Sequence, residues 1–213
     1  MLIEVWSDVV CPWCFIGKRR LEKAIAKLPD PTKVEVRHRA FQLQPDIDGV
    51  VSTSDYLSQK YRISPDEVEK MQANVCSIAD GEGLCYNLKE TLSGNTFNAH
   101  RLLLWAQERG KGQQLLEELY SSYFEKSEPV FTEANLTLIA ERAGISATDV
   151  HALLATEEFT SQVREDQAIA SQLGANGVPF FVFDMKYGIS GAQPQEVFDG
   201  TLAQALQEYV NAD

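Results

Sequence analysis

The sequence lacks several features that would assign a protein to a broad class. It contains no hydrophobic run of the ~20 residues that a membrane-spanning helix requires, no low-complexity linker and no repeat of fixed period. Residues 1–5 lack the basic segment and the long apolar segment of a signal peptide. These absences lead us to expect a cytoplasmic protein without a membrane partner.

Basic residues are also scarce. The 19 Lys and Arg are outnumbered by 31 Asp and Glu, which gives a formal net charge of -12. Such a surface repels phosphates, so nucleic acid and anionic membranes are not expected partners. Only four cysteines are present, and without an export signal they indicate catalytic or sensing thiols rather than a disulfide scaffold. The 213 residues, 44% of them hydrophobic, suffice for one large domain or two small ones.

Two of the cysteines stand in Cys11-Pro12-Trp13-Cys14, between an apolar run at residues 2–6 and a helical pattern that begins at Pro12. Proline suits the first position of a helix. The first turn of a helix has unpaired N–H groups and a partial positive charge, which favour the thiolate form of Cys11. A thiolate attacks disulfides, and Cys14, one turn on, could then close an internal disulfide.

Two other readings of this motif are weaker. A zinc site needs four ligands in tetrahedral array, whereas Cys76 and Cys85 lie far along the chain and neither pair has a neighbouring histidine. A structural disulfide over so short a loop would remove little chain entropy from the unfolded state. The motif therefore favours a redox function.

The hydrophobic periodicity predicts the order strand, helix, strand, helical block, two strands, helix. The second strand, 34–40, alternates, and His38 falls on its apolar side, which favours a buried histidine with a hydrogen-bond partner over a catalytic one. Pro179 at the start of a strand is awkward because it removes a ladder donor, yet the residues alone favour an ordinary trans bond. The remaining ranges are 53–173 for the helical block, 178–183 and 186–191 for the strands, and 194 onward for the last helix.

Four segments together resemble the DsbA family of thioredoxin-fold proteins, and within it the FrnE-like branch. They are residues 7–17, 95–102, 177–181 and 190–193, and they occur in the family's order along nearly the whole chain. The resemblance implies an α/β thioredoxin fold with a large all-α helical domain inserted after the second strand. The implied division is a first thioredoxin-like part at 1–50, an inserted helical domain at 51–158 and a second thioredoxin-like part at 159–213.

The resemblance also assigns roles to individual residues. Cys11 would be the attacking thiol and Cys14 the resolving one, with Pro179 as a cis-proline beside them. The implied partner is a disulfide-containing protein or a small-thiol substrate. The protein itself would be a monomer or a homodimer. No metal or bound cofactor is implied, and glutathione would serve only as a co-substrate. The residues expected to bind substrate are Pro12, Trp13, Phe97, His100, Val178 and Pro179.

Some roles stay open at this point. Asp8 could be a buried carboxylate that assists proton transfer to Cys14, although a loop residue that accepts backbone hydrogen bonds is favoured. His100 could line the cleft or pack behind it. Cys76 and Cys85 could form a second redox pair, although unrelated structural thiols are favoured.

One departure from the family bears on the direction of electron flow. The exported DsbA oxidants resemble Cys-Pro-His-Cys, whereas this chain has Trp13 in place of the histidine. A neutral indole supplies no cation near Cys11. We therefore expect a less oxidising couple than that of DsbA, which would rest largely as dithiol in a reducing cytoplasm.

Three functions compete on this basis. The first is a thiol–disulfide oxidoreductase. The second is a glutathione-dependent isomerase or transferase, like the related 2-hydroxychromene-2-carboxylate isomerase and kappa-class glutathione transferase, which typically have serine at the position of Cys11. The third is a chaperone or adaptor that holds unfolded chains in a cleft between the domains. The presence of both cysteines favours the first.

Overall fold

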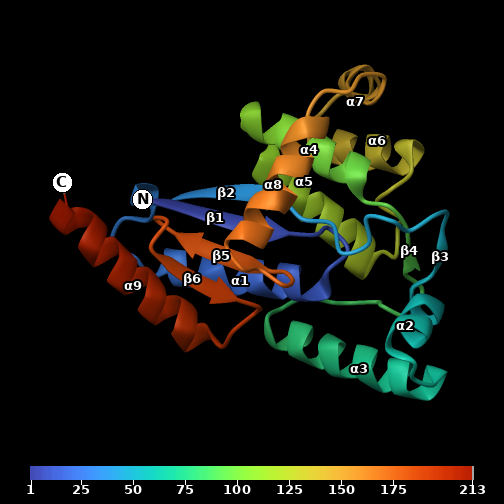
Figure 1. The fold of residues 1–213 in the computed structure, drawn as a ribbon, viewed down its shortest axis with the longest axis horizontal. Helices are drawn as coiled ribbons and strands as arrows, with labels where there is room; N and C mark the ends of the chain where they lie inside the picture. The colour runs from blue at the N-terminus through green and yellow to red at the C-terminus, as the bar shows by residue number, and fades with distance from the viewer. Residues whose placement is uncertain (213) are drawn as a thin grey trace.

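The computed structural model describes residues 1–212 and is built on a four-stranded sheet of order β2-β1-β5-β6 (Figure 1). β1 lies inside the sheet, parallel to β2 and antiparallel to β5, which in turn pairs antiparallel with β6. The strands are β1 (Leu2–Ser7), β2 (Glu35–Ala40), β5 (Phe180–Phe183) and β6 (Tyr187–Ser190). The first strand therefore pairs with a strand that follows it by about 180 positions, and the chain between them forms the rest of the molecule.

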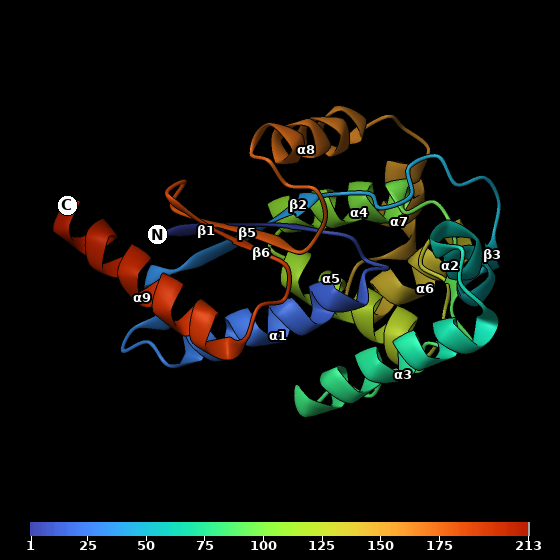
Figure 2. The ribbon, with the colours of Figure 1, turned by 60° about the horizontal axis from the view of Figure 1, so that its bottom comes forward.

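Helices cover both faces of this sheet (Figure 2). α1 (Pro12–Ala26) and α9 (Gln195–Ala212) lie on one face, and α8 (Thr160–Gln172) lies on the other. The first face buries the apolar side chains of alternate strand positions, which is why the strands alternate in sequence. That core includes Ile3, Val5, Phe181, Phe183, Phe198 and Leu202.

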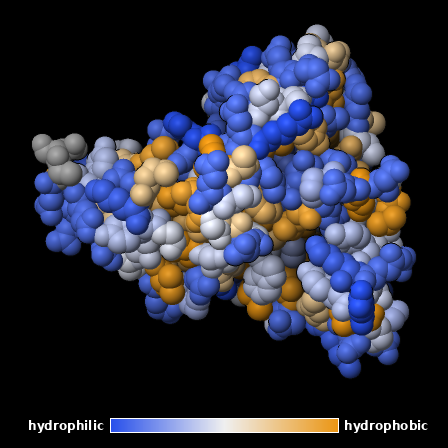
Figure 3. All heavy atoms as spheres, in the orientation of Figure 1, coloured by the Kyte–Doolittle hydropathy of each residue, from blue (hydrophilic) through white to orange (hydrophobic). Residues whose placement is uncertain are grey.

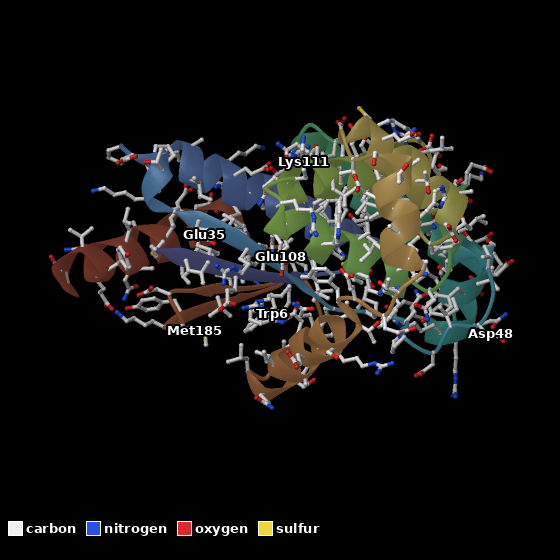
Figure 4. The ribbon with its side chains drawn as sticks, turned by 90° about the horizontal axis from the view of Figure 1, so that it is seen from above. Trp6, Glu35, Asp48, Glu108, Lys111 and Met185 are labelled. Carbon is white, nitrogen blue, oxygen red and sulfur yellow. The ribbon has the colours of Figure 1, made fainter. Side chains whose placement is uncertain are left out.

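The second face holds Trp6, which lies between the sheet and α8 in Figure 4. The Trp6 indole N–H donates to the backbone carbonyl of Asp166 at 2.8 Å. The carboxylate of Asp166 accepts from the backbone N–H of Ala40 at 2.9 Å and pairs with Arg39 at 3.1 Å. These contacts fix α8 to the ends of β1 and β2. Burial raises the pKa of Asp166 despite the nearby Arg39.

The chain between β2 and β5 is largely helical, which confirms the insertion predicted after the second strand. The structure adds one feature that the sequence did not predict, an antiparallel pair of two-residue strands. Strands this short carry no readable alternation. The short 3-10 helix η1 (Pro31–Lys33) precedes β2 and lies outside this region. The elements between β2 and β5 are β3 (Val51–Ser52), α2 (Thr53–Tyr61), α3 (Pro65–Gly81), β4 (Leu92–Ser93), α4 (Phe97–Glu108), α5 (Gly112–Tyr120), the π-helix η2 (Ser121–Glu125), α6 (Glu133–Arg142) and α7 (Ala147–Leu154), followed by α8.

Capping residues explain where several of these helices begin. Ser64 and Glu67 form a capping box at the start of α3. Thr96 is the N-cap of α4, but its side chain makes no cap bond. The preceding Asn95 accepts from the backbone N–H of Phe97 at 2.9 Å instead. Among the described helices, none combines the length and the apolar character that crossing a bilayer requires.

Candidate active site

The site forms where β1 ends and α1 begins. The backbone N–H of Cys11 donates to the carbonyl of Asp8 at 3.1 Å, so the chain turns directly after the strand. Cys11 is the N-cap residue of α1, and Pro12 occupies the first helical position, as the sequence predicted. The N–H of Cys14 then donates to the carbonyl of Cys11 at 3.0 Å. This turn holds both thiols at the positively polarised end of a 15-residue helix.

Both thiols are reduced and nearly buried in the structure. Cys11 is 3% exposed and Cys14 is 2% exposed. The thiol of Cys11 lies 3.5 Å from the backbone carbonyl of Val178, and the following Val178–Pro179 bond is cis. Burial raises the pKa of Cys14 well above its usual value, and the hydrogen bond and charge of Cys11 add to this effect. Cys14 therefore stays protonated in the dithiol state.

Gly17 lets the cysteine helix approach the loop that carries Pro179. A Cβ atom at this position would lie 2.9 Å from the ring of Phe181 and 3.1 Å from Pro179 Cγ. Both distances are shorter than ordinary carbon contacts. The glycine thus brings α1, Pro179 and the central strand β5 into direct packing.

Asp8 and His100 form a buried pair behind the cysteine turn. The Asp8 carboxylate is fully buried, accepts from the backbone N–H of Leu43 at 2.8 Å, and lies 3.3 Å from His100 Nε2. This confirms the favoured reading of Asp8 as an acceptor of a backbone hydrogen bond. Its proton-transfer role toward Cys14 stays a prediction. Because Leu43 follows β2, the pair ties the start of the insertion to the turn.

Tyr86 connects the insertion to the same turn from the opposite side. Its hydroxyl donates to the backbone carbonyl of Pro12 at 2.8 Å, across 74 positions of sequence. Its ring stacks on Phe124 with centroids 4.9 Å apart, and lies 6.2 Å from Phe15. A residue from the loop after α3 thus contacts the peptide between the two cysteines.

A groove of about 400 Å³ opens beside Cys11. One wall consists of the cysteine turn and Val178, and the opposite wall comes from α2 and α3. Figure 3 shows hydrophobic atoms where the lobe at the lower right, which carries α2 and α3, meets the rest of the molecule. Three of the residues expected to bind substrate line the groove, namely Pro12, Trp13 and Val178.

The structure corrects the placement of two other expected substrate-binding residues. His100 is 1% exposed and packs against Asp8, so it lies behind the turn. Phe97 lines a separate hollow with Gln42 and Val163, and its ring lies 5.9 Å from the guanidinium of Arg164. Neither residue lines the groove beside Cys11, because α4 packs its first turn toward β2 and α8.

The remaining histidine and cysteine candidates lie away from the groove. His38 is 3% exposed and contacts Gln113 at 3.1 Å, which confirms the buried reading. Cys76 is half-buried, with its thiol 3.8 Å from the carbonyl of Tyr86, and Cys85 is exposed. Both are free thiols, and the favoured reading of two unrelated structural thiols stays a prediction. Within residues 1–212, no cluster of three or more His, Cys, Asp or Glu side chains is placed to hold a metal ion.

Sequence reasoning missed the residues that form the far wall of the groove. Lys60 comes from the insertion and stands in no motif. Tyr86 also comes from the insertion and stands in no motif, but it contacts the cysteine turn and does not line the groove. Gln44 directly precedes Pro45 in the loop after β2 and also lines the groove. The only sequence signal for such residues was the aromatic spacing around Tyr56 and Tyr61, which is also typical of an ordinary helix face.

Comparisons with known proteins agree with this geometry. A family model described as a DSBA-like thioredoxin domain matches residues 2–203. A probable DsbA oxidoreductase from Streptomyces coelicolor has a crystal structure that is 43% identical, with a TM-score of 0.93 over 98% of this chain and 91% of that chain. An uncharacterised Bacillus subtilis protein, YwbO, is 26% identical over 94% of this chain and 95% of its own length. The α/β thioredoxin fold with a helical insertion is thereby confirmed.

A 2-hydroxychromene-2-carboxylate isomerase structure also matches, with 13% identity and a TM-score of 0.70 over the full length of both chains. At this identity the likeness concerns the fold alone. The fold therefore does not separate a redox enzyme from an isomerase. The residues at the end of β1 have to make that distinction.

Proposed function

This chain belongs to the family of DSBA-like thioredoxin domains, and from that premise we propose that it is a thiol–disulfide oxidoreductase in which Cys11 attacks and Cys14 resolves. One observation carries the proposal. Two reduced thiols share the first turn of α1, and the outer one borders an open groove beside the Val178 carbonyl. The identity of 43% to a probable DsbA oxidoreductase supports it further.

The first step joins Cys11 to the substrate. Its thiolate attacks one sulfur of a substrate disulfide, the substrate S–S bond breaks, and the leaving thiolate takes up a proton. The Val178 carbonyl lies 3.5 Å from the Cys11 sulfur, so the substrate cysteine would lie along the same backbone. The N-terminal end of α1 stabilises the negative charge on the Cys11 sulfur before attack.

The second step frees the substrate. Cys14 loses its proton and attacks the Cys11 sulfur, which releases the second substrate thiol and leaves a Cys11–Cys14 disulfide. The raised pKa of Cys14 keeps it protonated until this point. An external thiol then restores the dithiol. The reverse sequence would oxidise a dithiol substrate, and the couple's potential decides between the two directions.

The glutathione-dependent isomerase reading lacks a supporting observation of its own. In that chemistry a bound glutathione thiolate is the nucleophile, and a resolving protein thiol has no role. Both Cys11 and Cys14 are present here and adjacent at the helix start. Membership of the FrnE-like branch and a cytoplasmic location stay predictions.

Turnover of insulin disulfides with dithiothreitol as reductant tests the proposal. We expect Cys11→Ser to lower the rate to background. Cys14→Ser, mixed with insulin without dithiothreitol, should react once and accumulate a mixed disulfide that mass spectrometry detects. Cys85→Ser, which alters an exposed thiol outside the groove, is the matched control and should retain the full rate. Turnover that survives Cys11→Ser would exclude the proposed mechanism.

A further inference from the structure

The groove beside Cys11 differs in charge from the rest of the molecule. The chain carries a formal net charge of -12, yet no Asp or Glu among the described residues lines the groove. Its one Lys or Arg is Lys60, and most of its other lining groups are apolar or aromatic. Lys60 is exposed, so solvent screens its charge. A single cation beside an otherwise uncharged cleft still favours anionic ligands over neutral ones.

Lys60 has two structural explanations, and neither uses its hydrogen-bonding groups. It stands in the last turn of α2, where a cation interacts favourably with the helix dipole. Its ammonium also lies 5.4 Å from the ring centroid of Tyr56 and 5.9 Å from that of Tyr61. Among residues 1–212, no carboxylate lies within 4.0 Å of this ammonium. Its three N–H donors are therefore available to a ligand.

Gln44 lines the same groove, but its side-chain Oε1 is enclosed by the described residues and has no hydrogen-bond partner among them. An enclosed oxygen cannot accept from a ligand in this conformation. The groove therefore offers a ligand one charged group, the Lys60 ammonium, beside a largely apolar lining.

The size of the groove limits its occupant. About 400 Å³ is in the range of small-molecule sites and holds a molecule of tripeptide size rather than a folded domain. We propose that this groove binds a small disulfide, of about tripeptide size, that carries at least one carboxylate, which pairs with Lys60. This deepens the proposed function and rests on it, since the disulfide must reach the Cys11 sulfur.

The chemistry balances with the groups named. The Cys11 thiolate displaces one thiol of the small disulfide, Cys14 displaces the second, and two electrons pass from the protein dithiol to the substrate. Dithiothreitol in the assay returns the protein to the dithiol. Lys60 takes no part in bond breaking, so it acts on substrate preference.

The test compares two disulfides that differ in charge. The probes are glutathione disulfide, which carries carboxylates, and hydroxyethyl disulfide, which is neutral. The variants are Lys60→Gln and Lys70→Gln. Lys70 is exposed on α3 and does not line the groove, so both variants change the net charge of the protein equally. The measured quantity is the ratio of KM for glutathione disulfide to KM for hydroxyethyl disulfide.

We expect Lys60→Gln to raise this ratio about fivefold, in line with the loss of one partly exposed charge pair, and Lys70→Gln to leave it at the wild-type value. Equal ratios in the two variants would overturn the inference while leaving the oxidoreductase intact. A wild-type preference for insulin that is unchanged in Lys60→Gln would also overturn the inference, because it would indicate a protein substrate. A wild-type protein that reduces none of these disulfides would overturn the proposed function itself.

Discussion

The two walls of the groove are built differently. The cysteine wall is buried and tied down: Cys11 and Cys14 are at most 3% exposed, and Asp8 anchors their turn to the loop after β2. The α2 wall is loosely attached, since none of the α2 side chains is buried by the described residues. Its neighbours among the elements are α3, β3 and β4, which all belong to the insertion.

This difference separates chemistry from recognition. The reacting sulfurs need fixed geometry, because a small displacement weakens attack and resolution. Substrate contacts tolerate movement, and a helix with few buried contacts opens at low cost in free energy. The fold thus holds its cysteines on the sheet and places the variable contacts, including Lys60, on the element with the least packing.

The largest effect should come from comparing a buried leucine with one in the loose wall. Leu102 in α4 is fully buried, whereas Leu57 in α2 is half-buried beside the groove. We expect Leu102→Ala to lower the free energy of unfolding by about 3 kcal/mol or more, and Leu57→Ala by about 1 kcal/mol. Urea denaturation measures both. Similar losses in the two variants would break the contrast between packed and loose elements.

A second effect concerns buried His38 in β2, whose contribution to stability depends on pH. Burial, with a smaller contribution from Lys18, lowers the pKa of His38 to about 4, against about 6.5 in an unfolded chain. The unfolded chain binds a proton in this interval that the folded protein does not bind. The stability contributed by neutral His38 is therefore present above pH 6.5 and lost as the pH falls toward 4, with a full value of about 3 kcal/mol.

Denaturant unfolding at pH 7 and pH 4.5 tests this expectation. His38→Asn removes the titrating group, so its stability should fall less between the two pH values than that of the wild type. His151→Asn, at an exposed histidine, should follow the wild type. If the free energy of unfolding fell equally in wild type and His38→Asn between the two pH values, the folded protein would not hold His38 neutral.

The smallest effect concerns Tyr86, which links the insertion to the cysteine wall. Tyr86→Phe keeps the ring stack but removes the hydroxyl bond to the Pro12 carbonyl, worth about 1 kcal/mol. The structure shows this bond in the dithiol form, and we expect closure of the Cys11–Cys14 disulfide to weaken it. We therefore expect the variant to destabilise the dithiol and lower the reduction potential by up to ~20 mV, measured against a glutathione buffer.

Tyr123→Phe is the matched control for this measurement. The Tyr123 hydroxyl donates to the carbonyl of Leu92 at 2.8 Å. Tyr123 lines the groove, and this bond lies away from the cysteine turn. It should lose similar stability with no change in potential. Equal changes of potential in both variants would show that the insertion affects the couple only through general packing.

The sequence predicted the cysteine wall because its determinants are local. Pro12 opens the helix beside Cys11 within four residues, and the alternation of 34–40 placed His38 on the buried side. The order of strands and helices along the chain, with a helical block after the second strand, followed from the change of hydrophobic period. The family resemblance implied that this block is an insertion in a thioredoxin fold. Such signals depend on neighbours in sequence and need no knowledge of the tertiary arrangement.

The tertiary contacts around the cysteine turn could not be predicted because they join distant segments. The bond from Tyr86 to Pro12 spans 74 positions, and the pair of Asp8 with His100 spans 92. The family motif drew attention to Phe97 and His100 as substrate residues, but His100 is buried behind the turn and Phe97 lines a separate hollow. Lys60 had no pattern to mark it, since one lysine on an exposed helix is common.

The pairing of β1 with β5 has a consequence for synthesis. Ile3 pairs with Phe183, so a ribosome adding about 5–20 residues per second leaves one edge of the central strand without its neighbour for roughly 10–40 s. During that interval Cys11 and Cys14 have been made, but the Val178 segment that will border them has not. The nascent chain thus presents two thiols and an open strand edge to its surroundings, and reducing conditions or a chaperone would protect it at that stage.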